Sequence, residues 1–235
     1  MAYDSQAQRK PFVARGSKIG RCVGCFLPTQ SCLCSDKPSV KAAAVFWLLT
    51  HNDEYYKPTN TGRLIVDSIQ GSRVFKWSRT EPDPDFMSAL SDPVYAPCIV
   101  FPSGSNYQER MVKGSSFAGK TPAFIILDGT WRQARRMFRL SRYLDHLPVI
   151  ESGNDAVSRY QLRQSAKEHH LCTAEVGAAI LREVQDHNSA DVLDAYFDLF
   201  NAEYYASRRC VDMSSVSSQA RARLIELKEA DTSTY

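Results

Sequence analysis

An acid, a tryptophan and a row of arginines stand together in LDGTWRQARRMFRLSR, residues 127–142. Asp128 closes an apolar run, so we expect it at the carboxyl end of a buried strand, where open α/β sheets place their ligand crevices. Gly129 permits a sharp turn or a close approach to a ligand. Thr130 and Gln133 have the spacing of a capping box, which explains both without a function. The Asp128 carboxylate still needs a partner, either a ligand or the amino end of the following helix.

The arginines of this stretch predict contact with a polyanion. On a helix they fall within an arc of roughly 120°, and no aspartate or glutamate interrupts residues 129–144. Like charges on one helix face repel one another unless a polyanion neutralises them. Because arginine chelates phosphate and stacks on bases, structured RNA fits better than a small acid, while the alternative is a face that meets only solvent. These residues are Arg132, Arg135, Arg136, Arg139 and Arg142.

Four of the seven cysteines have the spacing of a metal site, C-x2-C-x6-C-x1-C. Four thiolates satisfy a closed tetrahedral zinc site, so we expect structural zinc rather than a catalytic metal. An iron–sulfur cluster and a set of free or transiently oxidised thiols are the alternatives. The expected ligands are Cys22, Cys25, Cys32 and Cys34. The other cysteines are expected to be ordinary buried residues, namely Cys98, Cys172 and Cys210.

The elements that must position these residues alternate between apolar runs and helical patterns, which indicates an α/β sheet flanked by helices. Predicted strands lie at 42–49, 73–78, 97–101, 122–127 and 147–151. Predicted helices lie at 59–69, 83–90, 173–186 and 189–206, with one more after Thr130. The expected parts are a basic flexible arm at 1–20, a four-cysteine zinc-binding segment at 21–40, a catalytic domain at 41–206 and a peripheral tail at 207–235.

Composition narrows the class of protein. The formal net charge is only +3, so basicity is local, in the arginine stretch, rather than global. No apolar run is long enough to cross a membrane, and the polar first ten residues lack the apolar stretch of a signal peptide. We therefore expect a cytoplasmic protein without a membrane partner.

Several motifs in fixed order resemble the DTW-domain family, the tRNA-uridine aminocarboxypropyltransferases. After the cysteine cluster come TNTGRL at 59–64, with His51 and Glu54 ahead of it, and FPSG at 101–104. DGTWRQARRM at 128–137, YQLR at 160–163 and CTAEVGAAIL at 172–181 complete the set. The resemblance covers about residues 21–200, and the D-x-T-W signature stands as Asp128, Thr130 and Trp131.

This resemblance implies a fold related to the SPOUT RNA methyltransferases, with a knotted C-terminal part that holds S-adenosylmethionine. It implies transfer of the 3-amino-3-carboxypropyl group of S-adenosylmethionine to N3 of a tRNA uridine, most simply the variable-loop uridine at conventional position 47. We expect a monomer. The alternatives are an S-adenosylmethionine-dependent RNA methyltransferase and a non-catalytic, zinc-bearing RNA-binding module.

Candidate site residues follow from the motifs and from the chemistry of the reaction. Uridine N3 becomes nucleophilic only when its proton leaves, so Asp128 is the candidate general base, or else it anchors the cofactor's ammonium or ribose. Trp131 packs on a base or in the core, and Thr130 caps a helix or meets a ligand. The expected cofactor residues are Phe101, Pro102, Ser103, Leu127, Asp128, Gly129, Arg163, Thr173 and Glu175. The expected tRNA contacts are Asn60, Thr61, Arg63, Arg132, Arg135, Arg136 and Arg139.

Overall fold

The computed structural model describes residues 19–112, 117, 119–152, 158–160 and 171–232. Its centre is a five-stranded parallel sheet in the order β2-β1-β4-β3-β5. The strands are β1 (Val45–Thr50), β2 (Arg73–Lys76), β3 (Tyr95–Val100), β4 (Thr121–Asp128) and β5 (Val149–Ile150). The helices are α1 (Gly62–Ser68), α2 (Pro84–Ser91), α3 (Trp131–Leu140), α4 (Thr173–Glu183), α5 (His187–Arg209) and α6 (Ser214–Thr232). Short 3-10 turns are η1 (Thr29–Ser31), η2 (Ser105–Arg110) and η3 (Arg142–Leu144).

The predicted α/β class is confirmed, and each predicted strand overlaps an observed one. The runs have little polar alternation because a parallel sheet is covered on both faces. All six residues of β1 are buried, as are the last six of β4. These two central strands pair from Val45 with Ala123 to Thr50 with Asp128, so their carboxyl ends lie side by side.

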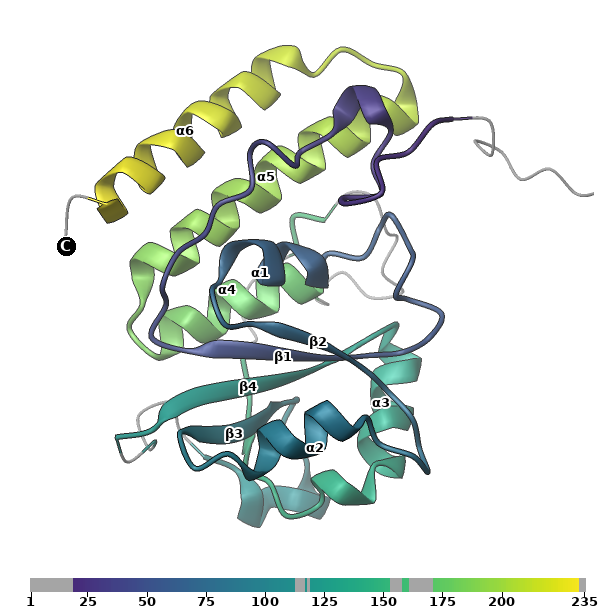
Figure 1. The fold of residues 1–235 in the computed structure, drawn as a ribbon, viewed down its shortest axis with the longest axis vertical. Helices are drawn as coiled ribbons and strands as arrows, with labels where there is room; N and C mark the ends of the chain where they lie inside the picture. The colour runs from purple at the N-terminus through teal and green to yellow at the C-terminus, as the bar shows by residue number, and fades with distance from the viewer. Residues whose placement is uncertain (1–18, 113–116, 118, 153–157, 161–170, 233–235) are drawn as a thin grey trace, which may run out of the picture.

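Two apolar cores lie on opposite faces of the sheet. One core joins Trp47 and Leu127 to α2 and α3, and the other joins Phe46 and Phe124 to α1, α4 and α5. Figure 1 shows the same layers, with α1, α4, α5 and α6 on one side of the sheet and α2 and α3 on the other. The sheet is therefore the middle layer, and its carboxyl edge is reached by loops from both sides.

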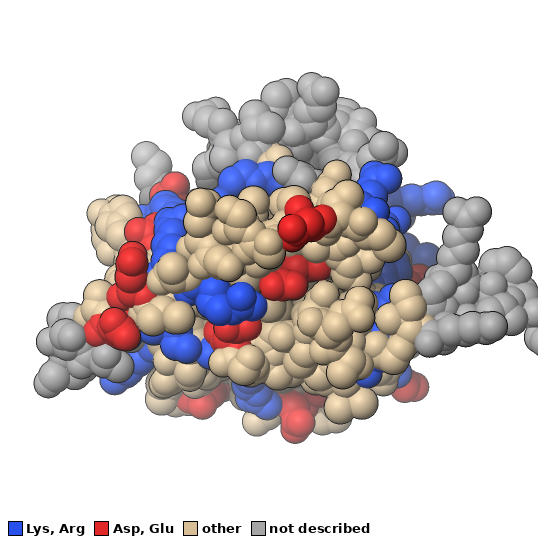
Figure 2. All heavy atoms as spheres, turned by 90° about the horizontal axis from the view of Figure 1, so that it is seen from above, with Lys and Arg blue, Asp and Glu red and all other residues tan. Residues whose placement is uncertain are grey.

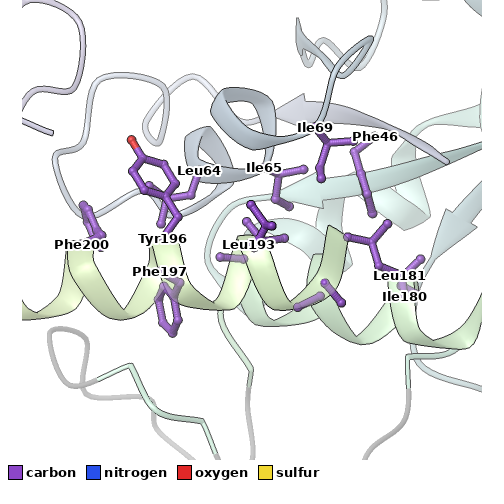
Figure 3. Packing of buried hydrophobic residues seen from close by; sticks show 14 of the residues in the cluster. Phe46, Leu64, Ile65, Ile69, Ile180, Leu181, Leu193, Tyr196, Phe197 and Phe200 are labelled. Atoms are coloured by element: carbon purple, nitrogen blue, oxygen red, sulfur yellow. The ribbon is translucent and has the colours of Figure 1, made fainter. Parts of the chain in front are cut away.

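Helix α5 organises the larger core. Figure 3 shows Leu193 and Tyr196 of α5 close to Leu64 and Ile65 of α1. The neighbouring helix α4 approaches α1 so closely that a Cβ on Gly177 would lie 2.7 Å from Ile65 Cδ1. Glycine at this crossing therefore allows α4, which carries Thr173, to sit against α1.

Most of the segment 207–235, expected to be a peripheral tail, is helix α6, which packs along α5. Leu224 is 1% exposed against this neighbour. Arg221 of α6 also pairs with Asp36, 2.9 Å from Nε to Oδ1, beside the cysteine segment. Charges of both signs are interspersed over the face that contains α5 and α6 (Figure 2). Asp194 of α5 forms ion pairs with Arg159 and Arg182.

The resemblance predicts a knotted C-terminal part, of which residues 153–157, 161–170 and 233–235 lie outside the described residues. The knot therefore stays a prediction. Among the helices that are described, none combines the length and the apolar character that a membrane crossing requires.

Candidate functional site

Asp128 lies at the carboxyl end of β4 in a buried polar pocket. Its side chain is 4% exposed. Oδ2 accepts hydrogen bonds from Asn60 Nδ2 at 2.6 Å and from Thr50 Oγ1 at 3.3 Å, and Oδ1 accepts one from Thr173 Oγ1 at 2.9 Å. We call Thr50, Asn60 and Thr173 the Asp128 cradle. The cradle joins the end of β1, the loop before α1 and the first residue of α4, so three motifs far apart in sequence meet on one carboxylate.

Burial dominates the electrostatics of this acid. It raises the pKa of Asp128 above its ordinary value, although the hydrogen bonds from Asn60 and Thr173 act in the opposite direction, and the nearby Glu54 raises it further. Asp128 therefore binds a proton more readily than an exposed aspartate does. A carboxylate in this state is suited to accept a proton from a ligand or to neutralise a cationic group.

Gly62 permits the cradle to close. Its N–H donates to Asn60 Oδ1 at 2.7 Å, which fixes the orientation of the Asn60 amide. A Cβ at this position would lie 3.1 Å from Asp128 Oδ1 and 3.1 Å from Leu48 Cδ1. The glycine of the TNTG motif is thus explained by the close approach of α1 to the acid.

The predicted capping box at the start of α3 is confirmed. The Thr130 hydroxyl accepts from Gln133 N at 3.3 Å, and the Gln133 side chain accepts from Thr130 N at 2.7 Å. Gln133 Nε2 also lies 3.1 Å from Nδ1 of His51, whose ring stacks on Trp77. Thr130 is therefore occupied by the helix cap, and His51 supports the turn between β4 and α3.

The predicted arginine face is present on α3. Arg132, Arg135, Arg136 and Arg139 are exposed, and Ala134 and Met137 of the same helix are buried. Among the described residues, the four exposed arginines of α3 form no ion pair, whereas Arg142 lies 3.6 Å from Asp145. The face is therefore free to meet an external anion.

An aromatic stack lies beside these arginines. Phe101 stacks on Phe138 at 4.2 Å between ring centroids and on Trp131 at 5.6 Å. Trp131 is 38% exposed, and the Arg135 guanidinium lies 5.7 Å from its ring centre. Phe101 and Phe138 line a groove of about 860 Å³ with the arginines of α3, Arg142 and Arg110. Aromatic rings beside guanidinium groups are typical of surfaces that bind nucleic acids.

Some predicted site residues have other partners in the structure. The carboxylate of Glu175 closes its own helix, accepting from Cys172 N at 2.8 Å and from Ser158 Oγ at 2.6 Å. The Arg63 guanidinium donates to the carbonyl oxygens of Cys25 and Lys57, rather than pointing to a free anion site. Both residues therefore contribute to the architecture around the acid.

The remaining predicted residues are spread around the strand ends. Thr61 is buried, with its Oγ1 3.4 Å from Ala174 N, and Leu127 belongs to the core beneath α3. The Pro102 carbonyl accepts from the Tyr107 hydroxyl, and Ser103 lines a second groove with Gln108 and Met111. Arg163 lies outside the described residues.

The four clustered cysteines converge as predicted for a metal site. Their Sγ atoms all lie within 4.8 Å of one another, with 3.6 Å between Cys22 and Cys34 and 3.8 Å between Cys25 and Cys32. Zinc–sulfur bonds of about 2.3 Å in a tetrahedron place the sulfurs about 3.8 Å apart, which the separations of these two pairs match. We call residues 22–27, which carry the first two ligands, the knuckle.

The clustered thiols differ in acidity when no cation lies among them. The backbone N–H groups of Cys25 and Gly24 lower the pKa of Cys22 to about 6, whereas burial raises the pKa of Cys34 to about 12. Four thiolates at such short separations require a positive ion to neutralise them. Of the other cysteines, Cys98 is buried as predicted, but Cys210 is exposed at the end of α5, so that prediction is wrong.

Two contributors to the site were missed from the sequence. Thr50 is the last residue of a buried strand, and only its register opposite Asp128 shows its role. Phe26 follows a metal ligand and lines a small cavity that also contains Asp128. A threonine ending an otherwise apolar run was the available signal for the first, while the second had none.

Comparison with known proteins agrees with the geometry. Residues 19–205 match the DTW domain. No solved structure matches the chain. The matched region contains the cysteine cluster, the Asp128 cradle and the arginine helix. The chain belongs to the DTW-domain family.

Proposed function

We propose that this protein transfers the 3-amino-3-carboxypropyl group of S-adenosylmethionine to N3 of a tRNA uridine, with position 47 of the variable loop as the target, and releases methylthioadenosine. Membership of the DTW-domain family is consistent with a role in tRNA modification. The observation that carries the proposal is the buried Asp128 carboxylate in its three-residue cradle at the carboxyl edge of the sheet. A helix cap does not need such a group.

Asp128 is the proposed acceptor of the uridine N3 proton. Its pKa, raised by burial, brings it closer to the working pH than an exposed carboxylate, and the cradle fixes the direction of its oxygens. Thr173 occupies Oδ1 with a single hydrogen bond, so this oxygen keeps capacity for a second donor. The Asp128 carboxylate is thereby oriented, with one oxygen able to accept a further hydrogen bond, before the substrate binds.

The residues at the strand ends fit the proposed cofactor by their chemistry. Asp128 and the Thr173 hydroxyl suit an ammonium group, and the half-exposed Trp131 offers a ring face. When bound, S-adenosylmethionine supplies a carbon activated by its sulfonium. We also propose, from the family resemblance, that a knotted C-terminal part of the SPOUT type holds S-adenosylmethionine, and that the protein acts as a monomer.

The arginine face of α3 is the proposed tRNA surface. Its four exposed guanidinium groups without acidic partners among the described residues suit a phosphate backbone. The aromatic stack in the same groove suits an unstacked base. The mixed charges over α5 and α6 make that face a poorer candidate (Figure 2).

Product analysis tests the proposal. Purified protein is incubated with S-adenosylmethionine and unmodified tRNA, and both the cofactor product and the tRNA nucleosides are identified by mass spectrometry. Methylthioadenosine with the matching mass gain on uridine is the expected result. S-adenosylhomocysteine would instead indicate methyl transfer, and no product would indicate a binding module. Asp128→Ala should abolish turnover while tRNA affinity is retained.

A further inference from the structure

A small cavity connects the knuckle with the proposed catalytic acid. It has a volume of about 210 Å³, and its lining includes Phe26 of the knuckle, Tyr55, Arg63 and Asp128. Pockets for drug-sized ligands are larger, typically about 300–1,000 Å³. The cavity thus has room for one flat ring with aromatic side chains at its wall and a carboxylate inside it.

The knuckle is held in place from both sides. Phe26 N donates to Cys22 O at 2.9 Å, and the Arg63 guanidinium binds the Cys25 carbonyl and lies 4.5 Å from the centre of the Phe26 ring. Phe26 adopts a left-handed conformation with φ of 59°, which a bulky residue takes only when its surroundings enforce it. The metal ligands Cys22 and Cys25 bracket this turn, so metal binding and Arg63 together fix the direction of the Phe26 ring.

The polar groups of the cavity suit the Watson–Crick edge of uracil. Asp128 accepts a proton from N3–H, whereas cytosine presents a bare N3 that would repel the carboxylate. Arg63 also lines the cavity, and its guanidinium, held by the Cys25 and Lys57 carbonyls, lies over the Phe26 ring. Since N3 lies on the pairing edge, the base must be unpaired before it can react.

We propose that this cavity is the nucleobase pocket and that the metal-bound knuckle, through Phe26, forms its aromatic wall. This inference rests on the proposed function for the identity of the base, a uridine of RNA. Phe26 contacts the base, and Arg63 acts as a positioning residue that connects the knuckle to α1. The four-cysteine segment then takes part in substrate recognition in addition to folding.

The test compares two changes on the same turn. Phe26→Ala removes the proposed wall, and Val23→Ala is the matched control because Val23 is 91% exposed and does not line the cavity. Loss of one base stack should lower kcat/KM for tRNA roughly 5- to 150-fold in Phe26→Ala, with metal content unchanged. Phe26→Trp should restore turnover, and Val23→Ala should match the parent protein.

Crosslinking tests the proposed nucleobase pocket independently of the proposed reaction. A tRNA transcript containing 4-thiouridine is irradiated with the full-length protein, and the adducts are mapped by mass spectrometry. Adducts on residues 22–27 that disappear in Phe26→Ala are expected. Adducts confined to α3, together with unchanged kcat/KM in Phe26→Ala, would overturn the pocket while leaving aminocarboxypropyl transfer intact. Adducts on the knuckle without methylthioadenosine release would support the pocket and refute the proposed reaction.

Discussion

Replacing Gly62 by alanine tests how tightly the Asp128 cradle is built. Alanine in a helix is ordinarily favoured over glycine by about 1 kcal/mol. Here the added Cβ would lie 3.0 Å from Asn60 Oδ1, 3.1 Å from Asp128 Oδ1 and 3.1 Å from Leu48 Cδ1. Overpacking of this kind costs roughly 1–3 kcal/mol. The net loss of unfolding free energy is therefore roughly 0–2 kcal/mol, which lowers the melting temperature by at most about 8 °C.

The effect of this change on turnover should exceed its effect on stability. Relief of the contacts moves the Asn60 amide or the Asp128 carboxylate, and misplacement of a catalytic group by about 1 Å costs roughly 100-fold in rate. Thermal melting and kcat/KM for tRNA are measured on the same preparation. Gly71→Ala is the control, since Gly71 has a φ of 78° and its Cβ would meet Val45 Cγ1 at 3.1 Å, at the amino end of β1. This variant should lose stability but keep most of its turnover.

A Gly62→Ala protein that melts above the parent and turns over normally would refute the importance of close packing around Asp128. Helix propensity would then outweigh the contacts, and the close approach of α1 to Asp128 would have no role in catalysis.

The other predictions concern charge, protonation and metal. Exchanging Arg135 and Arg139 for glutamate should weaken tRNA binding. It should also reduce the slope of the logarithm of the binding constant against the logarithm of salt concentration by roughly 1–2. The same exchange at Arg208 and Arg209 should change neither quantity. Because the folded-state pKa of Asp128 is raised, its ionisation costs stability as pH rises through that value. Asp128→Asn should therefore melt no lower than the parent at pH 8, and parent turnover should decline as pH falls through the raised pKa. A chelator that removes zinc, quantified by elemental analysis, should lower the melting temperature; an unchanged melt would contradict a structural metal.

The sheet was predictable because buried parallel strands are continuous apolar runs. VFWLLT and FIILD carry this signal directly, and each occurs as a central strand. The capping box of α3 was predictable for a similar reason, because both partners lie within one helical turn. Local sequence therefore predicts that these elements exist, and for α3 it also predicts where the helix starts.

Contacts between distant segments were not predictable in the same way. The partners of Asp128 come from residues 50, 60 and 173, and only the folded sheet and the α1–α4 crossing bring them together. Arg63 was expected to bind an anion, but its guanidinium donates hydrogen bonds to two backbone carbonyls instead. Helix α6 was missed because SSVSSQARARLIELKEADT has a weak apolar stripe, and its position depends on packing against α5.

Because of helix α6, the region that matches the family is shorter than the region that folds together. The family match stops at residue 205, within α5, whereas α6 continues to cover that helix. A chain cut at the homology boundary would uncover the α5 surface that Leu224 buries and would deprive Asp36 of Arg221. Asp36 follows Cys34, the last of the four clustered cysteines, by two residues, so a C-terminal truncation would remove a restraint on that cluster at the opposite end of the chain. Expression for assay should therefore extend through α6.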